Sequence, residues 1–497
     1  MDETNELFRE RLKKLDALRG LRLYEEPVDP YGGRFERSGS LKEIAAAFEE
    51  GKQVKVAGRL MAFRTHGKSS FCDLRDQEGK LQLYLKEDVV GKEVFDFFST
   101  KIDIGDILGV EGTLFKTKTG EPTVRVEKIV LLSKNLRPLP EKWHGLKDVE
   151  TRLRQRYVDL IMNEEARAVF LLRSRLIQKM RAILDANGFL EVETPMMHPI
   201  PGGAAGDPFK THHNALDMDL YLRLAPELYL KKLLVGGFEK VYEIAKSFRN
   251  EGISARHNPE FTMLEAYAAY WNDEDMLHFL ENMVVTLAKE ILGKTVLEYE
   301  TPEGTMTVDL TPPWERVSFA ALLKERYGIE PTDATEAWVA KLQKKGQQKG
   351  VGLNVQGKIA RSQVVKLTEE LLEPKEKGKP LFVVDYFKEM CPLAKSKRDN
   401  PDLCERFELF IGGMEVANAY SELNDPIEQK KRFEAQIDGA ADASKIDEDF
   451  VRALEYGMPP AAGLGVGIDR LTMLFTNQSS IREVILFPQL KPETKIL

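Results

Sequence analysis

The sequence feature that most constrains this fold is a glycine-rich stretch near the end of the chain. It reads GLGVGIDRLTMLF, from Gly463 to Phe475, and predicts a strand over 463–467 that runs into a helix beginning near Asp469. Glycines in a strand let a flat ligand approach the backbone closely, and Arg470 follows soon after. Neither a GxxxxGK[ST] string nor a strand-linked GxGxxG string occurs. A P-loop or Rossmann phosphate site is therefore excluded.

A second arginine-centred segment lies roughly two hundred residues earlier in the chain. It reads FRNEGISARHNPEFTMLE, from Phe248 to Glu265, and places Arg249 beside carboxylates. An arginine is always charged, and its planar guanidinium binds phosphate oxygens two at a time. Two such segments in one chain indicate a site that handles a polyphosphate.

The two segments resemble motifs 2 and 3 of the class II aminoacyl-tRNA synthetases. A third string, GFLEVETPMM, from Gly188 to Met197, resembles motif 1. The strings PGGAAGDPF, LRLAPELYLK, VYEIAKSFRNE and NAYSELNDP are similar to those of the lysyl-tRNA synthetases, and the resemblance runs from about Arg9 to the C-terminus. It implies an enzyme that uses ATP to join L-lysine to the 3′ end of lysine tRNA through lysyl-adenylate, releasing AMP and pyrophosphate.

Length and composition agree with this resemblance without showing the function. The chain has 497 residues, enough for two or three domains with their own cores. No apolar run approaches the roughly twenty residues of a membrane span, and the N-terminus lacks the apolar core of a secretory signal. Cys72, Cys391 and Cys404 are too few and too scattered for a disulfide framework or a zinc site. We expect buried or semi-buried thiols, a cytoplasmic location and no membrane partner.

The expected organisation is a helical segment over residues 1–50, a β-barrel domain over 51–134, a linker over 135–150 and a catalytic domain over 151–497. Five runs with strand patterns, and one short helical stretch (Lys92–Ser99) between the third and the fourth, match the five-stranded OB-fold. The five runs are Val54–Phe63, Ser70–Arg75, Leu81–Lys86, Ile107–Lys116 and Thr123–Leu132.

The barrel is expected to bind nucleic acid. The net charge of −8 does not indicate this, but residues 52–68 carry five Lys or Arg and no acid. A solvated charged surface is the alternative. Aromatic and polar side chains on the open face of such a barrel stack on and read unpaired bases. The resemblance implies that this domain holds the U-rich anticodon of lysine tRNA; the candidates, each of which could instead be a core or rim residue, are Arg64, Phe71, Gln82 and Glu127.

The catalytic region predicts an α+β domain with an antiparallel sheet. Helical patterns over 149–187 precede consecutive strands without regular βαβ alternation. A mainly helical block, at about 273–379, is expected to be an insertion. The strands expected on either side of it are Leu190–Thr194, Tyr221–Leu224, Val241–Phe248, Phe261–Tyr270, Leu381–Tyr386, Cys404–Ile411 and Met414–Tyr420.

Amino-acid activation needs no protein nucleophile, because the carboxylate of lysine attacks the α-phosphorus of ATP directly. Catalysis is then mostly positioning and electrostatic stabilisation. The resemblance assigns Arg249 to the α-phosphate and the substrate carboxylate, and Arg470 to the γ-phosphate. A structural salt bridge is the alternative for any arginine, and a surface histidine for His257. The remaining ATP-binding candidates are Glu251, Arg256, His257, Phe261, which would stack on adenine, and Glu415.

Two carboxylates predict a magnesium site. Glu408 and Glu415 lie seven residues apart in RFELFIGGMEV, on two adjacent predicted strands. Mg²⁺ prefers oxygen ligands and keeps phosphates and waters in its shell. The resemblance implies that Glu415 bridges metal ions and that Glu408 completes one of them. Either carboxylate could instead pair with a nearby arginine such as Arg406.

Selection of lysine calls for buried negative charge around an ammonium group. By resemblance, Glu422 with Tyr267 takes the ε-ammonium, Glu227 and the backbone of Gly203 take the α-amino group, and Asn418 with Arg249 fixes the carboxylate. The full set of lysine-binding candidates is Gly203, Glu227, Arg249, Glu265, Tyr267, Asn418, Tyr420 and Glu422.

Two other functions stay open on these residues. One is an enzyme that makes lysyl-adenylate but transfers lysine to a protein, although such paralogues typically lack the N-terminal barrel. The other is a non-catalytic RNA-binding relative, which intact Arg249, Glu415 and Arg470 argue against. By family resemblance we also expect a homodimer, because the apolar side chains of motif 1 (Phe189, Leu190, Val192, Met196 and Met197) could be buried between two copies.

Overall fold

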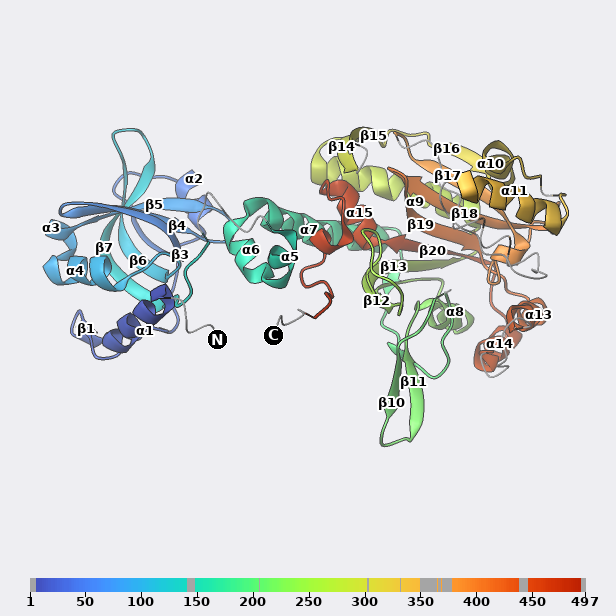
Figure 1. The fold of residues 1–497 in the computed structure, drawn as a ribbon, viewed down its shortest axis with the longest axis horizontal. Coiled ribbons are helices and arrows are strands. Elements are labelled where there is room, and N and C mark those ends of the chain that lie inside the picture. The colour runs from blue at the N-terminus through green and yellow to red at the C-terminus, as the bar shows by residue number, and fades with distance from the viewer. Residues whose placement is uncertain are drawn as a thin grey trace. The chain divides into compact units, whose positions relative to one another are not determined.

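The computed structural model divides the chain into two compact units, Met1–Lys147 and Asp148–Leu497 (Figure 1). The division falls inside the predicted linker. The residues that the structure describes are 6–140, 148–204, 206–301, 304–330, 332–348, 364, 368, 378–437 and 446–492.

The first unit begins with the predicted helical segment. This segment contains α1 (Glu6–Leu18) and α2 (Leu41–Ala46), with a short ribbon of β1 (Arg22–Leu23) and β2 (Glu26–Pro27) between them. Helix α2 starts with a capping box, in which Ser40 and Glu43 satisfy each other's backbone N–H groups. The rest of the unit is a barrel.

The barrel is closed, with the strand order β3-β4-β5-β7-β6. Four of the five neighbouring strand pairs are antiparallel. The fifth pair, β5 with β7, is parallel and closes the barrel. Alternate side chains of each strand, among them Val56, Leu74 and Val110, fill the interior. The OB-fold prediction is confirmed, with strand ends within a few residues of those expected. The elements are β3 (Gln53–His66), β4 (Ser69–Arg75), β5 (Lys80–Lys86), α3 (Glu87–Val90), α4 (Lys92–Lys101), β6 (Ile107–Lys116) and β7 (Pro122–Ser133).

The second unit is built on an eight-stranded sheet, in the order β16-β17-β18-β19-β20-β13-β12-β8. The six central strands are antiparallel, as predicted, and only the two outermost pairs are parallel. The predicted strand at Leu190 is short. The strands are β8 (Leu190–Glu191), β12 (Lys240–Phe248), β13 (Glu260–Ala269), β16 (Glu315–Ser318), β17 (Leu381–Phe387), β18 (Leu403–Ile411), β19 (Met414–Ser421) and β20 (Ala461–Gly467).

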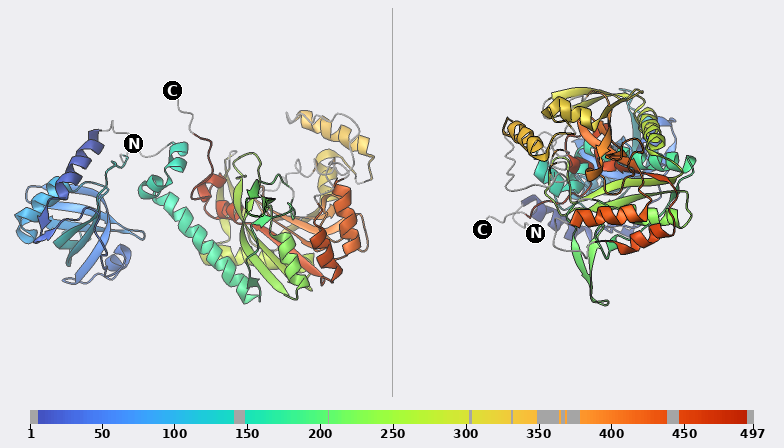
Figure 2. Two further views of the ribbon diagram at one scale, coloured as in Figure 1. Left: turned by 90° about the horizontal axis from the view of Figure 1, so that it is seen from below. Right: turned by 90° about the vertical axis from the view of Figure 1, so that its right-hand side faces the viewer.

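One face of this sheet is apolar. Leu264, Leu409 and Leu464 point from three strands into the main hydrophobic core, which the helices α7 (Glu164–Ala186), α9 (Asp273–Leu287) and α15 (Ile468–Phe475) close. Figure 2 shows α7 running along the strands. Because side chains alternate along a strand, the residues next to each of these leucines in sequence point to the opposite face of the sheet. That face carries the candidate site.

The remaining elements surround the sheet. They are α5 (Val149–Arg154), α6 (Arg156–Met162), β9 (Met197–His198), β10 (Lys210–His213), β11 (Met218–Leu222), α8 (Glu227–Val235), a π-helix (Ala288–Leu292), β14 (Val296–Thr301), β15 (Gly304–Asp309), α10 (Phe319–Tyr327), α11 (Thr335–Gln348), a 3₁₀ turn (Lys388–Met390), α13 (Pro426–Ile437), α14 (Glu448–Glu455) and α16 (Ile481–Val484).

Part of the block predicted as a helical insertion, 273–379, belongs to the main body of the unit. Helix α9 packs in the main core, and β16 pairs with β17 at the sheet edge. Strands β14 and β15 form a two-stranded sheet. Much of 349–377 lies outside the described residues. The limits of the insertion therefore stay a prediction.

Within the described ranges, no helix is long and apolar enough to cross a membrane. The three cysteines are buried free thiols, as expected.

Replacing Leu464 by alanine tests the apolar face. Leu464 is buried at the centre of the sheet, so a cavity there should lower the free energy of unfolding of the second unit by about 2–5 kcal/mol. Urea unfolding measures the change. Leu216→Ala is the control: its side chain is 65% exposed, and its effect should stay within about 0.5 kcal/mol. Equal effects of the two substitutions would contradict this account of the core.

Candidate active site

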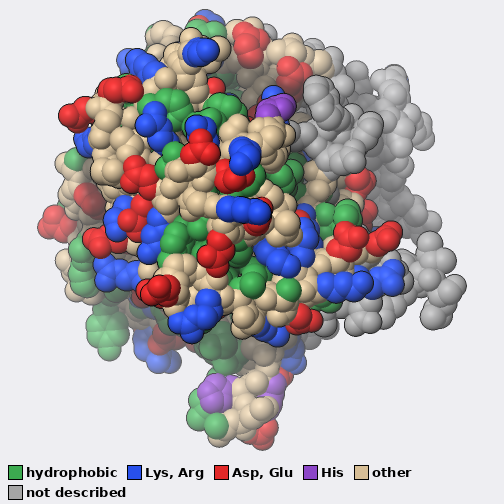
Figure 3. Space-filling view, turned by 90° about the vertical axis from the view of Figure 1, so that its left-hand side faces the viewer, with side chains coloured by type: hydrophobic (Ala, Val, Ile, Leu, Met, Phe, Trp, Pro, Cys, Tyr) green, Lys and Arg blue, Asp and Glu red, His purple; other side chains and the backbone are tan. Residues whose placement is uncertain are grey.

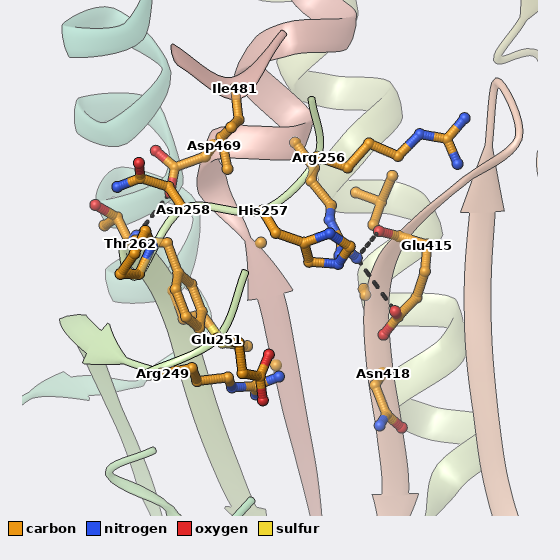
Figure 4. Close-up of a pocket in the computed structure, with 18 of the residues that line it drawn as sticks. Arg249, Glu251, Arg256, His257, Asn258, Thr262, Glu415, Asn418, Asp469 and Ile481 are labelled. Carbon is orange, nitrogen blue, oxygen red and sulfur yellow. Dashed lines mark hydrogen bonds and ion pairs between the residues drawn. The ribbon is translucent and has the colours of Figure 1, made fainter. Parts of the chain in front are cut away.

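The polar face of the sheet lies under two adjoining cavities of about 490 and 120 Å³. Both are lined by Arg249, Met263, Glu415, Asn418 and Gly465, so they form one continuous cleft. The smaller cavity is drawn in Figure 4. It holds the arginine-rich segments, whereas the larger one is rich in carboxylates.

Strand register places the site residues in rows. Glu408, Asn418, Gly465 and Glu265 are direct neighbours across four strands. Two residues further along, Tyr420, Gly463 and Tyr267 form a second row. Directly paired residues point to the same face of a sheet. These two rows, from segments far apart in the sequence, therefore form one surface under the larger cavity, which we call the floor.

The glycines of β20 keep this floor open. Gly463, Gly465 and Gly467 alternate with Leu464 and Val466, which point into the core. A Cβ atom on Gly463 would overlap the ring of Tyr267 and the Oε1 atom of Glu422. No other residue therefore fits at this position without displacing a site side chain. The prediction that these glycines allow close approach agrees with the geometry.

Three buried carboxylates, Glu227, Glu265 and Glu422, lie at one end of the floor. Tyr267 donates a hydrogen bond to Glu265 (3.1 Å), and Tyr420 donates one to Glu227 (2.7 Å). Burial raises the pKa of Glu265 to about 8, and the neighbouring charge of Glu227 adds to the shift. At neutral pH this carboxyl group is therefore mostly protonated, and it must release its proton to pair with a cation.

A buried ammonium group, which the sequence analysis did not identify, accompanies these acids. Lys231 Nζ lies 2.6 Å from Glu227 Oε1 and 2.5 Å from Glu422 Oε2. Burial lowers the pKa of Lys231, but the two carboxylates outweigh this and leave it raised. The spacing of Glu227 and Lys231, i and i+4 on one helix, was a signal for this pair.

Seven of the eight lysine-binding candidates line the larger cavity, and Glu422 is the one that does not. Gly203, Glu227, Arg249, Glu265, Tyr267, Asn418 and Tyr420 do line it. Glu422 lies behind Gly463 with its side chain fully buried against Lys231. Burial raises the pKa of Glu422, and the Lys231 ammonium opposes that shift. Gly203 adopts a positive φ of 82°, which favours glycine, beside Glu227.

Arg249 lies where the two cavities join. Its guanidinium carbon is 5.3 Å from the centroid of the Phe261 ring, and its buried Nε atom has no hydrogen-bond partner among the described residues. Burial lowers its pKa, while Glu251 and Glu415 oppose that change. Figure 4 shows Arg249 and Glu251 close together on the strand-connecting segment. An unpaired buried donor of this kind suits an anionic ligand.

Arg470, on α15, anchors the other side of the smaller cavity. Its guanidinium donates to the backbone oxygen (2.7 Å) and the carboxylate (3.1 Å) of Glu415 and lies 3.3 Å from His257 Nε2. Burial, followed by the charge of Arg470, lowers the pKa of His257. Arg256 donates to the backbone oxygen of Gly413. All the predicted ATP-binding residues therefore line this cavity.

The two predicted metal ligands both line the larger cavity, but each is paired with an arginine. Glu408 accepts hydrogen bonds from Arg406 (2.6 Å) and Tyr386 (2.7 Å), and Glu415 accepts one from Arg470. The alternative pairing of Glu408 with Arg406 is thus present. In the described part of the chain, no three or more Asp, Glu, His or Cys side chains are arranged so that they alone could hold a metal ion. Two carboxylates lining one cavity still supply the oxygen donors that Mg²⁺ needs when phosphates complete its shell.

On the barrel, Arg64 lies directly opposite Phe71, and Phe71 opposite Tyr84. The rings of Phe71 and Tyr84 are 4.7 Å apart, and Tyr84 also contacts Phe115 at 5.9 Å, beside Arg125. This aromatic and basic patch contains two predicted residues; Tyr84, Phe115 and Arg125 were missed, although the alternation of β5–β7 indicates their outward direction.

Two further barrel candidates, Gln82 and Glu127, are held in side-chain hydrogen bonds with neighbouring strands. On the face shown in Figure 3, basic and acidic side chains are interspersed. This face therefore carries no continuous basic surface.

Comparisons with known proteins agree with this geometry. Residues 148–491 match the family model of class II tRNA synthetases (D, K and N), and residues 54–132 match an OB-fold nucleic acid binding domain. Lysine–tRNA ligases of Carboxydothermus hydrogenoformans, Pelotomaculum thermopropionicum and Moorella thermoacetica are 52%, 53% and 51% identical, over 99% of this chain and 99%, 96% and 99% of theirs. The chain belongs to the lysine–tRNA ligase family of class II tRNA synthetases.

For this class II synthetase, the match includes the N-terminal barrel as well as the catalytic unit. Neither a barrel-less adenylate-forming paralogue nor a non-catalytic relative is supported by matches of this length to named ligases.

The raised pKa of Glu265 predicts a pH dependence of stability. Between about pH 4.5 and 8 the unfolded chain has released this proton while the folded protein keeps it, so stability falls as pH rises. Glu265→Gln removes this contribution. From pH 5 to pH 8 the parent should lose about 1 kcal/mol or more of its free energy of unfolding relative to this variant, as measured by urea unfolding. The exposed Glu455→Gln should show no such difference from the parent; equal behaviour of the two variants would refute a buried neutral carboxyl.

Proposed function

We propose that this synthetase joins L-lysine to the 3′ end of lysine tRNA through lysyl-adenylate, with release of pyrophosphate and then AMP. One observation carries the assignment of the amino acid: the cavity end with three buried carboxylates and one resident ammonium group opens directly onto the arginine-lined cavity. When all three carboxylates are ionised, two negative charges remain, and lysine carries two ammonium groups.

The first step needs alignment of two anions. The carboxylate of lysine attacks the α-phosphorus of ATP, a new O–P bond forms, and the bond to the bridging oxygen breaks so that pyrophosphate leaves. Arg249, at the junction of the cavities, is proposed to bind both the carboxylate and the α-phosphate. Arg470 is proposed to bind the γ-phosphate, and Phe261 to stack on adenine. The unpaired Nε atom of Arg249 supports the first of these roles.

The cofactor is proposed to be Mg²⁺, held by Glu415 and Glu408 together with phosphate oxygens. When bound, the ion neutralises charge on the phosphates and helps to orient them. For this to occur, Arg470 and Arg406 must share or release their carboxylate partners. Glu251, Arg256 and His257 are proposed to contact the nucleotide from the loop between β12 and β13.

Lysine is proposed to lie along the glycine floor. Glu227 and the Gly203 backbone would bind its α-amino group, Asn418 with Arg249 its carboxylate, and Tyr267 with Glu422 its ε-ammonium. Oε1 of Glu422 lies next to Gly463, so that an ammonium over this glycine can reach it. A substrate without the side-chain cation leaves buried carboxylates unpaired, which disfavours it strongly. Glu265 and Tyr420 complete the polar walls.

In the second step, a terminal hydroxyl of the tRNA attacks the carbonyl carbon of lysyl-adenylate, and AMP leaves. The barrel is proposed to hold the anticodon through the patch that contains Arg64 and Phe71, with Gln82 and Glu127 at its margin. Exposed aromatic rings next to guanidinium groups are suited to stack on unpaired bases.

We also propose a homodimer that acts in the cytoplasm. Three apolar side chains of the motif 1 segment are exposed in the single chain: Leu190 (51%), Met196 (43%) and Met197 (52%). A second copy would cover them. Phe189, which the sequence analysis placed with them, is already buried in the core of its own chain.

Lysine-dependent ATP–pyrophosphate exchange without tRNA tests the proposed reaction. Exchange should occur with lysine and be weak or absent with ornithine, arginine and aspartate, because only lysine matches both the charge and the length of the pocket. Glu422→Ala should reduce exchange with lysine by about a hundredfold or more, since it removes the receiver of the ε-ammonium. A folded protein that shows no exchange with lysine and Mg²⁺ would sink the proposal.

Arg64→Ala combined with Phe71→Ala tests the role of the barrel. Loss of a charge and a stacking surface should weaken tRNA charging about tenfold to a hundredfold, because each base stack contributes about 1–3 kcal/mol. Pyrophosphate exchange should stay unchanged, since the substitutions lie in the other unit. A parallel loss of both activities would place the anticodon role in doubt. The matched control is Lys52→Ala, on the barrel but outside the aromatic patch.

A further inference from the structure

Among the described residues, Lys231 is a buried cation beside the proposed amino-acid pocket to which the proposed reaction has assigned no task. It lies on α8, its side chain has no exposed surface, and its Nζ atom bridges Glu227 and Glu422 at 2.6 and 2.5 Å. The rings of Tyr420 and Phe450 lie 5.5 and 5.9 Å from it. An ammonium group held on all sides in this way cannot act as a solvated surface charge.

The contact with Lys231 sets the direction of Glu422. Lys231 binds the Oε2 atom, while Oε1 lies close to Gly463 on the pocket floor. Oε1 is buried and has no hydrogen-bond partner among the described residues. The carboxylate therefore has one oxygen engaged inside the protein and the other directed towards the place where a ligand would lie.

Lys231 also holds one oxygen atom of Glu227 in place. Its Oε1 atom accepts hydrogen bonds from Lys231 and from the Tyr420 hydroxyl (2.7 Å). Of the groups near Lys231 that can carry charge, Glu265 and Tyr267 on β13 complete the set formed by Glu227, Glu422 and Tyr420. Three of these five are carboxylic acids, and Lys231 is ion-paired with two of them, Glu227 and Glu422.

We propose that Lys231 is a positioning and specificity-determining residue: its ammonium group turns Glu422 towards the pocket floor and balances one carboxylate charge, so that the three carboxylates, once ionised, leave two negative charges, one for each ammonium group of the substrate. The inference rests on the proposed function. It assigns discrimination to a residue that does not itself need to touch lysine.

The charge balance explains why an internal cation helps a pocket that must bind another cation. Three carboxylates buried together repel one another, and burial favours their neutral forms. A neutral acid binds an ammonium group weakly and must first release its proton. The Lys231 ammonium opposes this rise in the pKa of Glu265 and of Glu422, so that both acids release their protons more readily when lysine binds.

Lysine-dependent pyrophosphate exchange by the full-length protein, measured from pH 6.5 to 9, tests this role. Lys231→Met keeps the length of the side chain but removes its charge. At pH 7 its KM for lysine should be about tenfold or more above that of the parent. As the pH rises, this KM should fall more steeply than the parent's, because the carboxylates then ionise even without the Lys231 ammonium. The KM for ATP should stay within about twofold. Lys231→Arg keeps the charge but moves it, so its KM for lysine should rise with a pH profile parallel to the parent's.

Lys232→Met is the matched control. Lys232 is the next residue on α8, but it pairs with Asp449 at the surface, so its KM values should equal those of the parent. A parent-like KM for lysine in Lys231→Met, or equal rises for lysine and ATP without a change in pH profile, would overturn the proposal.

Thermal unfolding checks that each variant is folded. If Lys231→Met does not fold, Lys231→Arg decides, because a parent-like KM for lysine in that variant would exclude positioning. If the parent itself shows no lysine-dependent exchange, the proposed function fails. If the parent is active and the Lys231 variants have the same KM for lysine as the parent, the proposed function stands and this inference fails.

Discussion

The structure of the catalytic unit depends on the two-sidedness of its central sheet. Alternation along β20 sends Leu464 and Val466 into the core under α7, α9 and α15, and leaves glycines at positions 463, 465 and 467 on the other face. The same period of two on β13 and β19 directs Glu265, Tyr267, Asn418 and Tyr420 to that face. Packing of the core and exposure of the site are therefore consequences of one register, and a slip of one residue would exchange them.

Burial of charge is the second constraint, and it separates the two ends of the cleft. At one end Lys231 is paired with two of three buried carboxylates, whereas at the other end Arg249, from the loop between β12 and β13, and Arg470, from α15, line the smaller cavity. Both arrangements oppose folding, since unpaired buried charges are costly. They suit a zwitterionic amino acid with an extra cation next to a polyanionic nucleotide. The bound ligands would neutralise the carboxylates and arginines that are incompletely paired in the protein alone.

Sequence patterns predicted the barrel closely, because its strands alternate and its turns contain glycine, and local signals of this kind need no knowledge of distant residues. They also identified the arginine segments and, by family resemblance, nine of the residues that line the larger cavity. The position of Glu422 behind the floor and the bridge from Lys231 were not predictable, because α8 and the end of β19 are nearly two hundred residues apart. The half-buried rings of Tyr84 and Phe115 were missed, although they alternate with buried leucines, because the patch is formed by neighbours from different strands.

By itself, the sequence determined the class of fold, the family and the residue types that the chemistry requires, since these follow from local periodicity and from long strings in a characteristic order. Only the tertiary structure decided which of those residues meet. The register of β18, β19, β20 and β13 brings Glu408, Asn418, Gly465 and Glu265 into one row, and the docking of α8 places Lys231 between two acids. Such contacts join segments whose separation along the chain exceeds the reach of any local pattern, so they depend on how complementary surfaces pack.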